Sequence, residues 1–363
     1  MKKHIVIIIT TLISAVTCLA GNPDRAGQAG ATELLINPWA RNSGWFGANS
    51  ASISGLESIH LNVAGLAATR KTEVAFAHTS WLGGAGIGIN AAGLAQKVGE
   101  TGVIGLSFMS MDFGNIDVTT VDLPEGGIGT FKPSYLNVGL SYAKSFSNSI
   151  SGGITVKIIS QSIANLKATG FCFDAGIQYA TTIGKKTNEL RKNNLRFGIA
   201  LRNVGPPMSF NGDGISVNGT VNQTGSSLTL EQRSSKFELP SLLSIGLTYI
   251  YRITTKHAVN FSGNFTSNSF SNDNIIGGLE YNFNNILMLR GGYNFQKNIG
   301  SNDNARIAYA GPSAGATVEI PVTKQRTNEA GEIKGGMRFG IDYSFRATHN
   351  FSGIHSFGAR ITL

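Results

Sequence analysis

Apolar and polar residues alternate along many stretches of the chain, as expected for β-strands with one apolar face and one polar face. In residues 135–142 and 171–179, an apolar side chain occupies every second position. The alternation is clearest where Met337, Phe339, Ile341, Tyr343 and Phe345 alternate with Arg338, Gly340, Asp342 and Ser344. These stretches predict an all-β fold.

The predicted strands are longer than those of most soluble proteins. Residues 133–146, 151–162, 241–253 and 286–296 exceed the usual length of about 5–6 residues, and a tilted strand that crosses a membrane needs ~9–11. Aromatic residues stand near strand ends, where membrane barrels carry interfacial girdles: Tyr249, Tyr251, Tyr281, Phe283, Phe345 and Phe351. A soluble sandwich would share the alternation, but strand length and aromatic placement favour a transmembrane antiparallel β-barrel.

The alternation predicts about fourteen strands, and an even number is typical of single-chain bacterial barrels. In the last stretch, Phe357, Ala359, Ile361 and Leu363 share one face, so the final strand is suited to pair with the first and leave no open edge. The predicted strands are 72–80, 84–97, 101–113, 133–146, 150–162, 169–182, 194–204, 241–253, 257–268, 274–283, 286–297, 304–319, 336–346 and 349–363.

The connections between these strands differ in length on the two sides of the barrel. With both termini periplasmic, the turns 147–149, 254–256 and 284–285 face the periplasm, and the long connections 114–132 and 205–240 face outward. Short periplasmic turns and long outer loops are the usual asymmetry of outer-membrane barrels. Two longer connections fall on the periplasmic side: 183–193 and 320–335.

The first residues predict export to the bacterial outer membrane. Two lysines precede an uncharged apolar run, 5–20, which ends in Cys18-Leu19-Ala20 with small residues suited to cleavage. This pattern is that of a secretory signal peptide, residues 1–20. A membrane anchor is the alternative, but the run is short for a spanning helix and a helix-breaking Gly-Asn-Pro follows it.

Composition changes this picture little. Charged residues are 14% of the chain, against about 25% in ordinary soluble domains, and glycine is 46 of 363 residues. A β-solenoid would show a short repeat in its sequence, and we find no such repeat in this chain. Removal of residues 1–20 leaves Cys172 as the only cysteine, which excludes an internal disulfide. The predicted barrel, 72–363, therefore depends on backbone pairing and apolar burial.

Residues 21–71 precede the first strand and are too apolar for a disordered tail and too irregular for strands. We interpret them as a hatch folded into the lumen; a periplasmic extension is the alternative. Polar residues on the inward parity of the strands indicate a filled or wet lumen: Lys157, Asp174, Arg196, Glu280, Arg290, Arg338, Asp342 and Arg360. Glu280 and Arg290 should oppose each other across a 284–286 turn. We favour mutual neutralisation and binding of the hatch over a solute-selecting constriction.

Residues 33–67 resemble the opening of the PorV/PorQ family, fourteen-stranded outer-membrane proteins similar to the FadL fatty-acid transporters. The resemblance rests on Ala40, Arg41, Gly44, Gly47, Asn62, Ala64, Gly65 and Leu66, which together with Trp45 are the predicted hatch residues. Further matches are Asn203-Val204-Gly205, Met208-Ser209-Phe210 and Leu239-Pro240. The chain departs from the family at Val63, where the family has proline, around Trp45-Phe46, where it has Gly-Met-Gly, and near Gly55-Leu56, where it has an acidic pair. These departures indicate a divergent member.

The resemblance implies a non-enzymatic accessory of type IX secretion, which binds cargo, sits beside the translocon or anchors an attachment complex. Its partners would be other outer-membrane or secreted proteins, and its basic charge would meet lipopolysaccharide. The alternative is a FadL-like channel for hydrophobic small molecules, with a hatch and a lateral opening. His78 and Ser80 share a strand face, but no acid is placed to complete a hydrolase site. We find no metal, cofactor or nucleic-acid signature.

Overall fold

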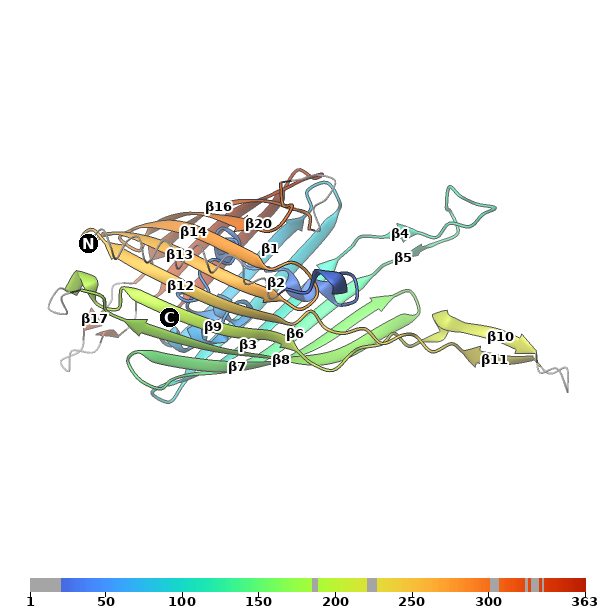
Figure 1. Cartoon of the computed structure of the whole chain (residues 1–363), viewed down its shortest axis with the longest axis horizontal. Coiled ribbons are helices and arrows are strands. Elements are labelled where there is room, and N and C mark those ends of the chain that lie inside the picture. The colour runs from blue at the N-terminus through green and yellow to red at the C-terminus, as the bar shows by residue number, and fades with distance from the viewer. Residues whose placement is uncertain are drawn as a thin grey trace.

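The computed structural model describes residues 21–184, 189–220, 227–300, 307–323, 326–327, 333–334 and 336–363. Fourteen antiparallel strands form one closed barrel, in which each strand pairs with its neighbours in the chain (Figure 1). The last strand pairs with the first over residues 73–80 and 355–362, so the sheet has no open edge. The predicted all-β fourteen-stranded barrel is confirmed, whereas the expected signal peptide lies outside the described residues.

The strand bounds follow the predicted ones to within three residues, except for the last strand and for the strand predicted over 304–319, which begins at Tyr309 and whose first predicted residues, 304–306, lie outside the described residues. Gly84 and Gly86 have φ angles of 94° and 71°, so the second strand starts three residues after the predicted position. Gly353, with a φ of 97°, delays the last strand in the same way. The barrel strands are β1 (Thr72–Trp81), β2 (Ile87–Val98), β3 (Gly102–Asp112), β6 (Ser134–Ser145), β7 (Ile150–Ile163), β8 (Leu166–Thr181), β9 (Leu195–Val204), β12 (Leu242–Arg252), β13 (His257–Asn268), β14 (Asn274–Phe283), β15 (Leu287–Phe295), β16 (Tyr309–Pro321), β19 (Arg338–Thr348) and β20 (Ile354–Thr362).

The outer wall of the barrel is apolar and the inner wall is polar or small. On β6 and β8, Leu140 and Ile177 are 59% and 57% exposed, while the alternate positions Ser141 and Cys172 are buried. The same division runs around the sheet, because side chains alternate between the two faces of each strand. Such an outer wall is suited to lipid. No helix in the described part of the chain is long and apolar enough to cross a membrane.

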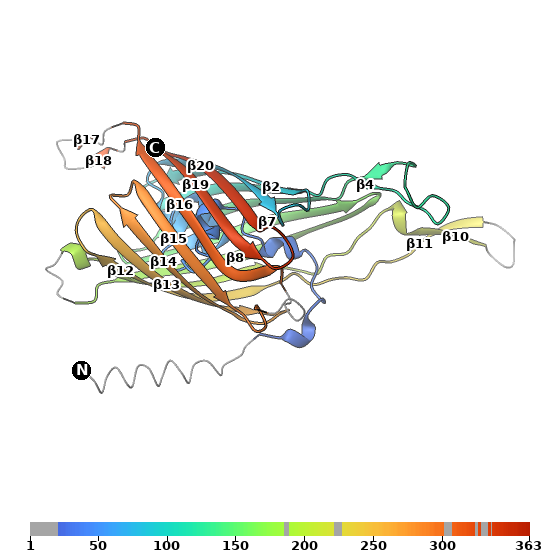
Figure 2. The same cartoon turned by 90° about the horizontal axis from the view of Figure 1, so that it is seen from above.

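The two ends of the barrel differ, and we name them by their connections. At the short-turn end, β6–β7 and β14–β15 are joined by only a few residues. At the long-loop end, two small hairpins project well beyond the barrel (Figures 1 and 2). They are β4 (Ile116–Asp117) with β5 (Thr130–Phe131), and β10 (Ser216–Thr220) with β11 (Ser227–Glu231).

Residues 21–71, which we call the N-terminal segment, run through the lumen (Figure 2). The segment begins at the long-loop end, where the Gly21 amide donates to Asp273 Oδ2 at 2.7 Å and Ala29 pairs with Glu238. It leaves at the short-turn end to enter β1. The segment therefore crosses the lumen from one end of the barrel to the other, and the structure does not contradict its interpretation as a hatch. Its helices are η1 (Pro23–Arg25), η2 (Thr32–Leu35), α2 (Ala40–Ser43), η3 (Leu56–His60) and η4 (Val63–Ala68).

The N-terminal segment packs directly on the inner wall. Leu34, Leu56 and Leu66 are at most 1% exposed. Glycine in the wall permits this close approach: a Cβ on Gly292 of β15 would lie 2.3 Å from the Trp45 carbonyl oxygen. Any larger residue there would displace the segment or the strand. The segment therefore fills the middle of the lumen.

Candidate functional site

The N-terminal segment leaves open space on both of its sides. A cavity of about 680 Å³, the outer chamber, lies at the long-loop end between the segment, the loops and strands β12–β16. Two adjoining cavities of about 350 and 580 Å³, together the inner chamber, lie at the short-turn end. The lumen thus has two chambers of different chemistry with the segment between them.

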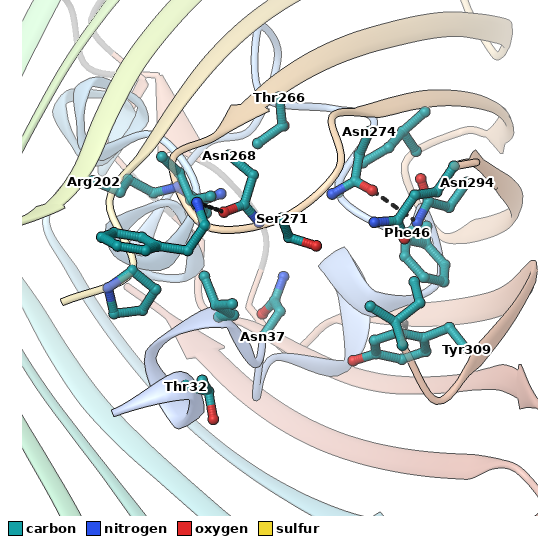
Figure 3. A pocket seen from close by; sticks show the side chains of 18 of the residues that line it. Thr32, Asn37, Phe46, Arg202, Thr266, Asn268, Ser271, Asn274, Asn294 and Tyr309 are labelled. Atoms are coloured by element: carbon teal, nitrogen blue, oxygen red, sulfur yellow. Dashed lines mark hydrogen bonds between the residues drawn. The ribbon is translucent and has the colours of Figure 1, made fainter. Parts of the chain in front are cut away.

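The outer chamber is lined by neutral polar and apolar side chains, together with two arginines. Strands β13, β14 and β15 supply neutral side chains, among them Asn268, Asn274 and Asn294, which point into the cavity (Figure 3). The apolar side chains come mainly from elsewhere, including Phe46 of the N-terminal segment and Phe270 of the β13–β14 turn. Uncharged amides among apolar side chains are typical of small-molecule pockets, where few polar groups fix the orientation of a ligand.

The inner chamber is rich in arginine. Arg41 of the N-terminal segment lines both of its cavities, together with Arg196 and Arg252 of β9 and β12. Arg252 Nη1 donates to the Lys192 carbonyl oxygen at 2.9 Å, which holds it at the short-turn end. Four carboxylates also line these cavities, so groups of both charges face the inner chamber: Glu57, Glu73, Glu280 and Glu319.

Arg360 of β20 is surrounded by four carboxylates at the boundary between the segment and the wall. Its Nη1 lies 3.3 Å from Glu57 Oε1, and Asp342 Oδ2 lies 3.9 Å from the same atom. Glu73 and Glu319 each lie 4.0 Å from other nitrogens of the guanidinium. Glu57 belongs to η3 while the other groups belong to strands, so this cluster joins the N-terminal segment to the barrel seam.

A second buried cluster starts from the Glu280–Arg290 pair. The two residues are Cα partners across β14 and β15, and Arg290 Nε donates to Glu280 Oε2 at 2.9 Å, as predicted from the turn length. Arg290 Nη2 also donates to Thr317 Oγ1 at 2.7 Å, and Thr317 in turn donates to Asp342. Asp342 thereby connects this pair to the Arg360 cluster.

Lys157 and Asp174 form a separate ion pair on the opposite wall. Lys157 Nζ also donates to the side-chain oxygen Oδ1 of Asn203 at 3.0 Å, while the backbone N–H of Asn203 donates to Asp174 Oδ1 at 2.8 Å. The neighbouring Arg202 donates to the His60 carbonyl oxygen at 2.9 Å. Lys157 and Asp174 thus neutralise each other within the wall, and only Arg202 of this group binds the backbone of the segment.

Two titratable groups of the N-terminal segment are strongly affected by their surroundings. Burial raises the pKa of Glu57 to about 7, and the nearby Asp342 carboxylate adds to this shift, against the opposing effect of Arg360. Burial lowers the pKa of His60 well below its usual value, and Lys157 and Arg202 act in the same direction. His60 is therefore neutral at physiological pH.

The predicted hatch residues lie in the segment and shape its path. Ala40 and Arg41 belong to α2, and Gly44, Trp45 and Gly47 to the turns that follow. Asn62 caps η4 through the Ala64 amide and donates to the Ser50 and Ile177 carbonyl oxygens, so it fixes the segment to β8. Gly65 allows close packing, since a Cβ there would lie 2.2 Å from the Ile53 carbonyl oxygen. Leu66 is fully buried beside them.

The structure does not bring all the predicted polar residues to one place. Arg290, Asp342 and Arg360 are connected, Arg338 lies at the edge of this group with its Nε 3.7 Å from Glu319 Oε1, and Lys157 and Asp174 stand apart. Sequence reasoning missed Glu57, Glu73 and Glu319. The strand parity of Glu73 and Glu319 points inward, but only the folded path of the segment places Glu57. Within the described residues, no group of His, Cys, Asp or Glu is arranged to hold a metal ion.

Comparison with known proteins supports the fold. No family model matches the chain, and no curated protein matches it at a significant level. Among solved structures, the CymD monoaromatic hydrocarbon channel has a TM-score of 0.51 at 13% identity, over 90% of this chain and 97% of that one. The Pseudomonas putida toluene transporter TodX has a TM-score of 0.51 at 13% identity, over 86% and 94%.

At this identity the likeness extends to the fold alone. The chain has the closed fourteen-stranded architecture of these channels along nearly its whole length. The resemblance to the PorV/PorQ family stays a prediction from the sequence.

Proposed function

We propose that this protein is an outer-membrane channel that takes up small, largely apolar, uncharged molecules through the outer chamber. The observation that carries the proposal is the cavity of about 680 Å³ at the long-loop end, walled mainly by neutral polar and apolar side chains, together with Arg202 and Arg346. Pockets that bind small molecules usually measure ~300–1,000 Å³ and are lined in this way. The fold shared with the CymD and TodX hydrocarbon channels supports the same function.

The orientation of the barrel in the membrane sets the direction of the proposed uptake. Outer-membrane barrels place their long loops outside the cell and their short turns in the periplasm. The outer chamber would then receive molecules from outside, and the arginine-rich inner chamber would face the periplasm. The apolar outer wall would contact membrane lipid and lipopolysaccharide.

Uptake by cells or proteoliposomes tests this function directly. Ser271 lines the outer chamber, whereas Ser269, two residues earlier, is exposed and does not line it. Ser271→Trp should fill part of the chamber and slow uptake of a small aromatic hydrocarbon, while Ser269→Trp should leave the rate unchanged. Equal uptake by both variants and by the unaltered protein would remove the outer chamber from the transport path.

A second candidate function is the binding of other proteins, as an accessory of an outer-membrane secretion machine such as type IX secretion. One observation favours it: Val217, Leu228 and Leu230 are each at least 50% exposed on the projecting β10–β11 hairpin. Exposed apolar side chains on a projecting hairpin are suited to a protein partner.

Co-purification from native membranes, with and without residues 212–235, tests this second candidate. Loss of a stoichiometric partner on deletion would support it, and deletion of 118–128 from the other projecting hairpin is the matched control. An unchanged set of partners after the 212–235 deletion would exclude a role for this hairpin.

A further inference from the structure

Five buried polar atoms on side chains that line the outer chamber have no hydrogen-bond partner among the residues described, and one of them is His60 Nε2 of the N-terminal segment. Two are acceptors: Asn294 Oδ1 near the end of β15, and Gln296 Oε1 one residue after the end of that strand. Two are donors, Arg202 Nε and Arg346 Nε, from β9 and β19. Buried polar groups are nearly always paired, so a cluster of unpaired ones around a cavity indicates where a ligand binds.

Other polar atoms of these side chains already have hydrogen-bond partners. Asn294 Nδ2 donates to Asn274 Oδ1 at 3.5 Å, and Gln296 Nε2 donates to the Asn272 carbonyl oxygen at 3.4 Å. Arg346 donates to Tyr309 Oη at 3.1 Å and stacks over the Tyr309 ring, 5.4 Å from its centroid. The terminal amide torsion of Asn and Gln is soft, so a modest rotation turns each oxygen toward the cavity.

The combination of unpaired acceptors and unpaired donors restricts the chemistry of a ligand. A carboxylate only accepts hydrogen bonds and would leave the two amide oxygens unpaired, and an ammonium group only donates and would leave the two arginine nitrogens unpaired. A hydrocarbon pairs with neither. A hydroxyl group both donates and accepts, so a molecule with several hydroxyls can satisfy both kinds of atom.

The rest of the chamber agrees with an uncharged ligand that also has an apolar part. Asn264, Thr266 and Asn268 of β13 add neutral groups to the lining, and Phe46, Phe270 and Ile276 line the same cavity. Aromatic rings pack well on the apolar faces of ring-shaped ligands.

We propose that the outer chamber binds an uncharged molecule that combines an apolar ring or chain with several hydroxyl groups, such as an aryl or alkyl glycoside. This inference rests on the proposed uptake function and names its class of substrate. Hydroxyls of the ligand bind Asn294, Gln296 and Arg346 on the β15–β19 side of the chamber and Arg202 on the β9 side, while the apolar part lies beside Phe46 and Phe270.

Three probes that share a methylphenyl group test the inference: toluene, p-toluate and 4-methylphenyl β-glucoside. Binding to the full barrel in phospholipid nanodiscs is measured by isothermal titration calorimetry, which avoids glycoside detergents. We expect the glucoside to bind at least about tenfold more tightly than toluene or p-toluate.

Variants locate the binding within the lumen. Asn294→Leu and Gln296→Leu should each lower the preference for the glucoside over toluene, given as the ratio of the two dissociation constants, about tenfold. Asn282→Leu is the matched control, because Asn282 is an asparagine of β14 that lines the inner chamber instead. The mobility of unheated protein in a gel reports whether each variant forms a closed barrel.

The outcomes separate this inference from the proposed function. Preferred binding of toluene, unaffected by the leucine variants, would overturn the inference and preserve uptake of apolar molecules. Preferred binding of p-toluate would overturn it in favour of a charged ligand. Absence of binding by all three probes would count against the inference and against small-molecule uptake by the outer chamber.

Discussion

Arg360 on the last strand and Glu57 in the N-terminal segment form an ion pair, with Nη1 and Oε1 3.3 Å apart, next to the pairing of β20 with β1. The guanidinium is 4% exposed and is the common partner of Glu57, Glu73, Glu319 and Asp342. One buried cation thus compensates carboxylates from the segment, the first strand and the last strands. The two ends of the sheet and the material inside it are coupled at this point.

Replacement of this cation should loosen the segment. Arg360→Met leaves several buried carboxylates without their shared partner, and we expect a loss of about 3–5 kcal/mol of unfolding free energy. Urea unfolding in lipid vesicles, followed by fluorescence of the buried Trp39 and Trp45, measures it. Arg338→Met is the control, since its side chain is 21% exposed and its one carboxylate is 3.7 Å away. An equal loss in both variants would show that Arg360 has no special role.

The docking of the N-terminal segment should depend on pH through Glu57. Its pKa is about 7 in the folded protein against 4.5 for the unperturbed carboxyl. The folded state therefore favours the protonated form, and this contribution is fully present below pH 4.5 and is lost as pH rises through 7. Stability should fall by up to about 1.4 kcal/mol per pH unit within this window.

Glu57→Gln keeps a neutral group of the same shape and should remove this part of the pH dependence. The comparison is made by tryptophan fluorescence of both proteins between pH 5 and 8. Parallel pH profiles of the two proteins would show that another group is responsible.

A single methyl group on the inner wall should disturb the segment without altering the strand. A Cβ on Gly292 would lie 2.3 Å from the Trp45 carbonyl oxygen, whereas a Cβ on the adjacent Gly291 would be 3.6 Å from its nearest atom. We expect Gly292→Ala to lower stability by about 1–3 kcal/mol and to change the Trp45 fluorescence. Gly291→Ala should have little effect on either. A reversed order would contradict the described packing.

A disulfide can test whether uptake requires movement of the segment. A Cβ built on Gly358 of β20 would lie 3.4 Å from the Ala40 Cβ of α2, close to the separation of about 3.5–4.5 Å in disulfides. We expect the oxidised Ala40→Cys, Gly358→Cys protein to take up substrate more slowly, and dithiothreitol to restore the rate. Each single cysteine variant is the control. Uptake at the full rate in the oxidised form would mean that the segment stays in place during transport.

The barrel could be predicted in detail because the sequence features that define it lie within single strands and turns. A period of two assigns each side chain to one face, and a short turn fixes the register of its two strands. Glu280 and Arg290 were therefore placed opposite each other from the sequence, and the structure shows them as Cα partners. Alternation also gave the number of strands and the closing role of the last one.

The chambers and the Arg360 cluster were not predictable in the same way. The N-terminal segment follows no period, so nothing local indicates that Glu57 meets Arg360, which lies 303 positions later in the chain. The outer chamber likewise depends on Asn294, Arg202 and Phe46, which come from distant parts of the chain. Glycines such as Gly292 mark close approach, but not which part of the segment approaches.

The path of the N-terminal segment also constrains assembly. Its first described residue contacts the β13–β14 turn at one end of the barrel, and it joins β1 at the other end. A ring of strands that had already closed could accept this segment only if Trp39 and Trp45 were drawn lengthwise through it. If the sheet instead wraps around the segment, no such passage is needed, and the β1–β20 seam is the last to form. The segment is then a template for the curvature of the sheet as well as the content of its lumen.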